Sequence, residues 1–267
     1  MPAAAGILDG LSPAARALLR GFTLQEEMDS TNSFISRIPP DHRHGHAAMA
    51  LRQSSGRGRG EHRWHSPPGG NLYLSLGWRF EAGTPELSTL PLLVAVCLAR
   101  ALADVGLRGH GVKWPNDILV GGRKLAGVLV ESQSAGGERF VAIIGVGVNI
   151  RMPDDSAAAA IDRPWTDLSR ELGPGMGSEP DANAMAVALL ERLLPGLKTF
   201  ESEGFASFRE DWARFDLLSE RLVRLTAKGE VSQGVAQGID RFGSLLVETA
   251  DGRVRAFHHG EASIVRD

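Results

Sequence analysis

Two neighbouring segments of this chain are apolar at almost every position, and they constrain the fold more than any other feature. They span Lys124 to Gln133 and Arg139 to Ile150, with Ser134-Ala135-Gly136-Gly137 between them as a predicted hairpin turn. A strand that is apolar on both faces must be covered on both faces. The pair therefore predicts the centre of a sheet with elements packed on each side.

Other segments before residue 217 also have helical or strand patterns. Strands are predicted over 22–26, 47–52, 72–80 and a short run at 118–120, and helices over 12–21, 32–38, 88–105, 166–172, 184–203 and 205–215. Residues 151–183 are predicted to be a loop-rich connection around the short helix. Proline lacks the backbone N–H that a helix needs, so we expect the 184–203 helix to bend or end early at Pro195.

The last part of the chain has a different pattern. Short apolar runs are separated by Gly229, Gly243 and Asp251-Gly252, which is typical of a small antiparallel barrel. The expected strands cover 222–226, 231–239, 245–249 and 254–258. We place the boundary near Leu218, which predicts two domains, 1–217 and 218–267.

Composition and charge narrow the class of protein. With 29 Lys+Arg against 32 Asp+Glu the net charge is -3, which argues against a dedicated nucleic-acid binder. A single cysteine, Cys97, excludes an internal disulfide, and its apolar neighbours indicate a buried thiol in a reducing compartment. We see no secretory signal and no run of about 18 uninterrupted apolar residues. A cytoplasmic protein without a membrane partner is expected.

A glycine–arginine loop, Gly56 to Gly60, is the first candidate for a binding site. Glycines let backbone N–H groups approach a ligand, and the arginine side chains at 57 and 59 offer planar forks that match carboxylates and phosphates. The rigid segment Trp64-x-Ser66-Pro67 follows. The loop is interpreted as an anion-binding element, with a solvated turn as the alternative.

Two further motifs place cations beside a buried strand. Lys113-Trp114-Pro115-Asn116-Asp117 combines a cation, an amide and a carboxylate in a proline-containing turn. Arg123 to Gly127 begins the first apolar strand with two cations and ends at a glycine where a ligand could lie close. An Asx-type turn with a surface lysine and a charged strand entry are the plainer readings.

Polar residues also precede the helix predicted at 32–38. Asp29-Ser30-Thr31-Asn32 could be a ligand-binding segment or only a helix cap, since these residue types are the preferred caps. Known nucleotide signatures are missing: there is no G-x-x-x-x-G-K-[ST] run, and Gly145-Val146-Gly147 lacks a third glycine and a following helix. His42, His44 and His46 lack carboxylate or cysteine partners nearby, so a metal site there is not expected.

The order of these motifs resembles that of biotin–protein ligases, also called biotin–[acetyl-CoA-carboxylase] ligases. The resemblance covers nearly the whole chain and rests on Asp29 to Asn32, Gln53, Gly56 to Arg59, Trp64-x-Ser66-Pro67, Asn71-Leu72-Tyr73, Lys113 to Asp117, Arg123 to Gly127 and Gly145 to Asn149. It implies an α+β catalytic domain with a mixed sheet, related to class II aminoacyl-tRNA synthetases and lipoate ligases. A small SH3-like antiparallel β-barrel is implied after it.

Members of that family make biotinyl-5′-AMP from biotin and MgATP, and then pass biotin to one lysine of a biotin carboxyl carrier domain. The catalytic residues implied by the resemblance are Lys124, Arg57, Asp117 and Lys113. The implied biotin contacts are Ser30, Thr31, Asn32, Gln53, Gly56, Arg57, Lys124, Gly127 and Gly145. The implied ATP or adenylate contacts are Arg57, Arg59, Trp64, Asn116, Lys124 and Asn149. Asp117 is also the candidate ligand for Mg²⁺, and Arg57 is expected to close over carboxylate and phosphate.

The second reaction step needs a base. A lysine side chain is neutral in only about 1 part in 2,500 at neutral pH, and Asp117 is our hypothesis for the group that removes its proton.

One departure from the family pattern follows the second arginine of the loop. Gly60-Glu61-His62 stands where the family has a basic residue, a glycine and an arginine. A glutamate there is expected to raise the Michaelis constant for ATP or to let the adenylate leak. Replacing the three residues by Arg-Gly-Arg tests this, since the two properties should then improve.

Other readings and partners stay open at this point. A lipoate-type ligase would share the fold and the adenylation chemistry, and a non-catalytic biotin or nucleotide sensor would share the pocket. We also expect no DNA partner, because the helix-turn-helix domain of some family members does not precede Asp29. Either a monomer or a homodimer is compatible with the sequence.

Overall fold

The computed structural model describes residues 3–60, 62–81, 84, 86–134, 140–153, 161, 163–173, 181–227 and 229–265. Some sequence predictions fall wholly or partly outside these residues. They are the Ser134 to Gly137 turn, the first residue of the strand predicted from Arg139, the effect of Glu61, and part of the 151–183 connection.

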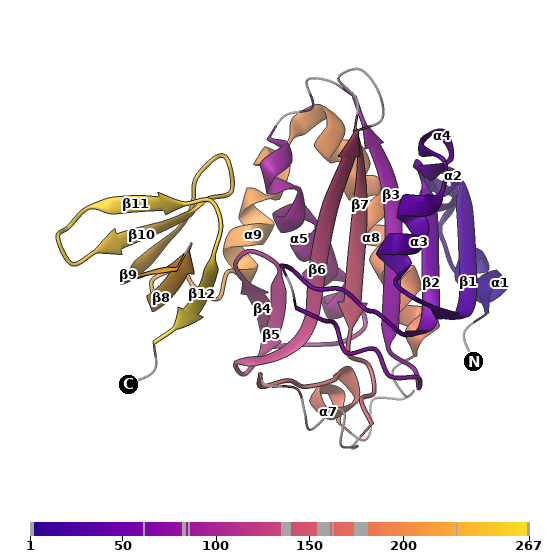
Figure 1. The fold of residues 1–267 in the computed structure, drawn as a ribbon, viewed down its shortest axis with the longest axis horizontal. Helices are drawn as coiled ribbons and strands as arrows, with labels where there is room; N and C mark the ends of the chain where they lie inside the picture. Colours follow the sequence, from indigo (N-terminus) through magenta and orange to yellow (C-terminus); the bar gives the residue numbers. More distant parts are fainter. Residues whose placement is uncertain are drawn as a thin grey trace.

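A seven-stranded sheet forms the centre of the molecule (Figure 1). Its strand order is β1-β2-β3-β7-β6-β5-β4. The strands are β1 Gly21–Met28, β2 His46–Gln53, β3 Leu72–Phe80, β4 His110–Lys113, β5 Asp117–Val120, β6 Arg123–Ser134 and β7 Phe140–Val148. β1 and β2 are parallel and the other pairs are antiparallel, so the sheet is mixed. The predicted α+β fold class and the central position of β6 and β7 are confirmed.

Helices cover both faces of this sheet, as its apolar strands require. On one face α5 Leu90–Asp104 and α8 Ala182–Glu203 pack together against the sheet, with α1 Ala4–Asp9, α2 Pro13–Leu18 and α9 Arg209–Phe215 beside them. On the other face α3 Thr31–Arg37 packs on β2, β3 and β7. The chain after β2 crosses this second face in Figure 1. The remaining short helices are α4 Pro40–Arg43, η1 Leu87–Thr89, α7 Leu168–Leu172 and η2 Ala206–Phe208.

The prediction that the last long helix ends early at Pro195 is wrong. α8 runs through this position for 22 residues, although proline cannot donate to the carbonyl of Glu191. Leu194 and Leu197 on either side are fully buried. A Cβ atom at Gly196 would lie 2.9 Å from the Cys97 sulfur of α5, so the two helices approach closely there. We attribute the continuity of α8 to this burial, which outweighs one missing backbone hydrogen bond.

Cys97 lies in this contact, and burial raises the pKa of its thiol to about 12. The thiol is therefore un-ionised at mildly alkaline pH, and only a thiolate reacts readily. We expect the native protein to show no colour change with a disulfide reagent until denaturant unfolds it. Reaction of the native protein at the rate of the unfolded chain would contradict this packing.

The segment that contains α5 is long and apolar enough to cross a membrane. The window Leu87–Asp104 has a mean hydropathy of 1.7 and passes by length and composition, and 67% of it is buried inside the fold. It packs against both α8 and the large sheet, so its apolar surface is used in the core.

A second, five-stranded antiparallel sheet follows, with strand order β11-β10-β9-β8-β12. Its strands are β8 Leu222–Ala227, β9 Glu230–Ile239, β10 Leu245–Thr249, β11 Val254–Phe257 and β12 Glu261–Ile264. This confirms the predicted small SH3-like antiparallel unit, and β12 is an addition to it. The β9–β10 turn contacts the part of the chain that forms the large sheet. Trp114 Nε1 donates to the Gly243 carbonyl at 2.9 Å, and Ser88 Oγ donates to the Phe242 carbonyl at 2.8 Å. These bonds hold the C-terminal sheet beside the β4–β5 turn.

Candidate active site

One pocket of about 830 Å³ lies over the second face of the large sheet and reaches the C-terminal sheet. Its walls come from the start of α3, the end of β2, the glycine–arginine loop, the β4–β5 turn, β6, β7 and residues 226–227 and 259–261. Every residue predicted from the sequence as a catalytic, biotin or adenylate contact lines it. Segments more than 100 residues apart in the sequence are therefore brought to a single cavity.

A β-bulge sets the direction of Lys124. The β5–β6 register shifts between Ile118 and Leu119, so that Leu119 pairs with Lys124 while Ile118 pairs with Ala126. An extra residue in one strand re-aims its neighbours. Leu125 and Ala126 are both buried in the core, and the Lys124 side chain lies on the pocket side with Gly127, whose Cβ would come 3.2 Å from Lys124 Nζ.

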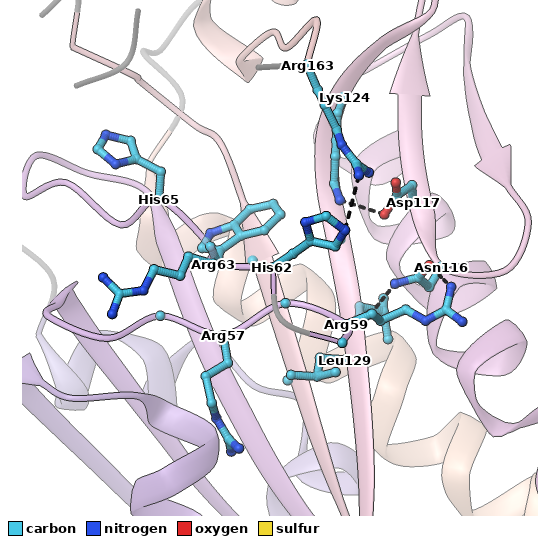
Figure 2. A pocket seen from close by; sticks show the side chains of 18 of the residues that line it. Arg57, Arg59, His62, Arg63, His65, Asn116, Asp117, Lys124, Leu129 and Arg163 are labelled. Carbon is cyan, nitrogen blue, oxygen red and sulfur yellow. Dashed lines mark hydrogen bonds and ion pairs between the residues drawn. The ribbon is translucent and has the colours of Figure 1, made fainter. Parts of the chain in front are cut away.

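Two lysines share one carboxylate at this end of the pocket. Lys124 Nζ lies 2.7 Å from Asp117 Oδ1 and Lys113 Nζ lies 3.8 Å from Asp117 Oδ2. Only 11% of the Asp117 side chain is exposed. Two ammonium groups on one carboxylate leave a net positive charge, so this cluster attracts anions. Figure 2 shows the Lys124–Asp117 pair.

The predicted Mg²⁺ ligand, Asp117, is a poor fit for a resident metal. Both of its oxygens face ammonium groups, and no group of three or more His, Cys, Asp or Glu residues that could hold a metal occurs in the described part of the chain. Mg²⁺ at nucleotide sites is commonly held by one or two carboxylates together with substrate phosphates. The geometry thus fits the expectation from the resemblance that Mg²⁺ enters the site together with ATP.

Trp64 packs flat on the sheet between the lysine cluster and the glycine–arginine loop. Gly127 on β6 and Gly147 on β7 are cross-strand partners, and a Cβ atom on them would lie 3.0 Å and 2.5 Å from the indole ring. Only residues without a side chain leave room for the ring here. Lys124 Nζ lies 5.2 Å from the ring centroid, a cation–π contact that adds to the fixed position of both side chains.

Buried hydroxyl and amide groups form the opposite end of the pocket. Gln53 Oε1 accepts from the backbone N and from Oγ1 of Thr31 at 2.9 and 3.2 Å, and Gln53 Nε2 donates to Ser66 Oγ at 2.9 Å. Ser75 Oγ lies 2.7 Å from Thr31 Oγ1. Ser30 occupies the N-cap position of α3, yet its side chain makes no capping bond there. The segment Ser30 to Asn32 therefore does more than cap a helix: it forms part of a polar surface in the pocket.

Asn32 belongs to the same network. Its Oδ1 lies 2.6 Å from Ser75 Oγ and its Nδ2 donates to Glu131 Oε2 at 2.7 Å. A Cβ atom at Gly145 would lie 2.2 Å from Asn32 Oδ1, so this glycine makes room for the amide. Ser75 and Glu131 were not predicted, although a lone serine in the apolar run of β3 was a usable signal.

The two arginines of the loop point in different directions, as Figure 2 shows. Arg57 donates from Nη1 and Nη2 to the two carboxylate oxygens of Glu131 at 2.9 and 2.7 Å. Arg59 extends toward the lysine cluster, where Nη1 lies 3.4 Å from Asn116 Oδ1 and 3.5 Å from the Gly260 carbonyl. Arg59 is the loop arginine that reaches the β4–β5 turn, and the closing of Arg57 over carboxylate and phosphate stays a prediction.

The two predicted asparagines mainly hold backbone segments. Asn116 Nδ2 donates to the Val128 carbonyl at 2.6 Å, and Asn149 Nδ2 to the Thr166 carbonyl at 3.1 Å. Their contacts with an adenylate stay predictions.

A polar cluster closes the outer wall of the pocket. Arg163 Nη2 lies 3.2 Å from His62 Nε2 and 3.2 Å from Glu261 Oε1, and His62 Nε2 lies 3.6 Å from the same oxygen. The three side chains come from the loop after β2, the chain before α7 and the start of β12. No sequence motif joins them, so the cluster was not predicted, although His62 belongs to the segment that departs from the family pattern.

The fold and the site together define a class, the protein ligases of the biotin and lipoate type. The chain matches the Biotin/lipoate A/B protein ligase family over residues 26–149 and the Biotin protein ligase C terminal domain over residues 218–265. It belongs to the biotin protein ligase family.

Individual relatives agree with this assignment. The bifunctional ligase/repressor BirA of Escherichia coli is 34% identical, over 97% of this chain and 76% of its own length. The biotin–[acetyl-CoA-carboxylase] ligase of Paracoccus denitrificans is 32% identical, over 84% of this chain and 93% of its own. Among solved structures, a biotin protein ligase from Aquifex aeolicus in complex with biotin and ATP superimposes with a TM-score of 0.76 at 26% identity, over 93% of this chain and 100% of the other.

Proposed function

We propose that this protein activates biotin with MgATP as biotinyl-5′-AMP and transfers the biotinyl group to one lysine of a biotin carboxyl carrier protein, in the cytoplasm. The observation that carries the proposal is the division of one pocket into two ends. One end offers buried hydroxyl and amide groups that match a neutral ureido ring, and the other offers the lysine cluster with Arg59. The relatives named above support the same reaction.

The first step joins two anions. A carboxylate oxygen of biotin attacks the α-phosphorus of ATP, the bond to the bridging oxygen breaks, and pyrophosphate leaves. Two unit charges at about 4 Å repel by roughly 4 kcal/mol at an effective dielectric of about 20. Lys124, Lys113 and Arg59 offset this repulsion and the charge that develops in the transition state.

The second step forms an amide bond. The neutral amine of the carrier lysine attacks the acyl carbon of the adenylate, AMP leaves, and the amine loses a proton. Asp117 is the carboxylate of the pocket closest to Lys124, and we assign it the proton acceptor. Its contact with Lys124 also makes it responsible for the position of that ammonium group.

Replacement of Asp117 by Asn tests this role. We expect transfer from preformed biotinyl-AMP to a carrier domain to slow by roughly 100-fold in a single turnover, because a general base contributes about that much or more. A matched control is Asp104→Asn, since Asp104 also pairs with a cation, Arg192, but on the surface between α5 and α8. If the Asp117 variant transferred biotin at the wild-type rate, Asp117 would not be the general base.

The proposed function itself is tested by substrate-dependent ATP–pyrophosphate exchange. Biotin is expected to drive exchange and lipoate is not. Exchange driven by lipoate instead would make the chain a lipoate-type ligase. Binding of biotin with neither exchange nor attachment to a carrier domain that survives denaturation would make it a sensor.

A further inference from the structure

Glu131 lies on the pocket face of β6 but has no part in the reaction described above. Side chains alternate across a strand, so Glu131 shares its face with Leu129 and Gly127, which line the pocket. The carboxylate therefore lies beside the polar end of the pocket, two residues along β6 from Leu129, which lines the pocket.

Two donors from different elements converge on this carboxylate. Arg57 of the glycine–arginine loop donates to it from Nη1 and Nη2, and Asn32 at the start of α3 donates to Oε2 at 2.7 Å. Paired fork contacts fix the orientation as well as the distance of the two groups. The loop and the amide at the polar end are thus held by a single side chain.

The Asn32 amide has little freedom to find another partner. Only 3% of the residue is exposed, its Oδ1 lies against Ser75 Oγ, and Gly145 leaves it room only because it has no Cβ. Removing Glu131 would leave a buried amide N–H without its acceptor, so the amide would lose the contact that holds it in this orientation.

The Arg57 contact ties the glycine–arginine loop to β6, in addition to the backbone hydrogen bonds of the loop. The side chains of Arg57 and Glu131 are 40% and 33% exposed. An ion pair with this much solvent exposure adds little to the overall stability of the protein. Its effect is local. With Arg57 tied to β6, Arg59 two residues later extends over the pocket toward Asn116.

We propose that Glu131 is a positioning residue for biotin activation, which places the glycine–arginine loop and the Asn32 amide in one fixed relation. The proposal rests on the proposed function, because the pocket that Glu131 organises is the one assigned to biotin. Glu131 acts through Arg57 and Asn32 and does not touch the reacting atoms.

Its test separates binding from chemistry. Glu131→Ala is expected to raise the Michaelis constant for biotin in ATP–pyrophosphate exchange by roughly tenfold or more, the effect of one lost hydrogen bond to a charged group. Transfer from saturating synthetic biotinyl-AMP should stay within about twofold of wild type, because the lysine cluster and Asp117 are untouched. Asp104→Ala, which removes an equally exposed bidentate pair with Arg192, should change neither.

A double-mutant cycle and hydrogen exchange complete the test. Arg57→Ala together with Glu131→Ala should show less than the summed effect of the single variants, because both remove the same contact. Backbone amides of residues 56–64 should exchange faster in Glu131→Ala and in Glu131→Gln, which keeps the size of the side chain if the alanine variant folds poorly.

The outcomes are distinct. A folded Glu131→Ala or Glu131→Gln protein with the wild-type Michaelis constant for biotin and wild-type loop exchange would overturn the positioning role. If the wild-type protein gave no biotin-driven pyrophosphate exchange, the proposed function would fail, and the hydrogen-exchange comparison would still decide whether Glu131 holds the loop.

Discussion

Replacing Lys124 by Met is expected to lower biotin-driven ATP–pyrophosphate exchange by about 100- to 1000-fold, the range measured when one preorganised donor to a developing charge is removed. Lys124 Nζ is held by Asp117 at 2.7 Å and lies over Trp64, so its charge is aimed before any substrate enters. Methionine keeps the apolar stem that packs on the indole ring but removes the charge. The measurement is the exchange rate at saturating biotin and ATP.

The control for this variant is Lys198→Met. Lys198 also forms a close ion pair, with Glu201 at 2.6 Å, but it lies on α8 and 65% of its side chain is exposed. The Lys198→Met variant should leave the rate of biotin-driven ATP–pyrophosphate exchange unchanged. A Lys124→Met protein that keeps the wild-type melting temperature and exchanges within about threefold of wild type would show that this lysine does not offset the anionic charge.

Replacing Gly147 by Ala is expected to reduce kcat/KM for biotin by roughly tenfold or more without any change in charge. The new methyl group would lie 2.5 Å from the Trp64 ring, closer than atoms pack, so the indole must move and with it the face that Lys124 contacts. Overpacking of this kind also costs about 1–3 kcal/mol of stability. Steady-state kinetics and thermal unfolding check the two parts.

A graded series makes this prediction sharper. Gly127→Ala should have a smaller effect, since its methyl group would lie 3.0 Å from the ring, and Gly6→Ala should have none, with its nearest neighbour at 3.9 Å. If Gly147→Ala, Gly127→Ala and Gly6→Ala all had the same kcat/KM for biotin, the position of Trp64 would not be important for catalysis.

Much of the site could be predicted because its motifs stand at the ends of strands. Gln53 ends β2 and Asp117 begins β5, so each places a polar group at one end of a strand. The aim of Lys124 could not be predicted, because it depends on a bulge that leaves no mark in the residue pattern. The partners Glu131 and Glu261 were missed for a related reason: each meets its arginine across about 74 and 98 residues of sequence.

The fold shows the same division between local and distant causes. Long apolar runs such as β3 and β7 were predicted correctly, since their pattern is local. Two of the four-residue strands, β4 and β12, were not predicted: each is too short to have a periodic pattern and pairs with the edge that a neighbouring strand offers. Pro195 is the opposite case, where a strong local signal yields to the packing of α8 on α5.

The C-terminal sheet has a further consequence for how this protein could be recombined. Thr226, Ala227 and residues 259–261 form part of the wall around the pocket, and Glu261 meets Arg163 across the opening. The sheet is therefore not an interchangeable module, although it is a separate unit by strand pairing. A chimera that took its C-terminal sheet from a relative would exchange one side of the cavity, and it would need the donor's matching residues at 62 and 163 as well.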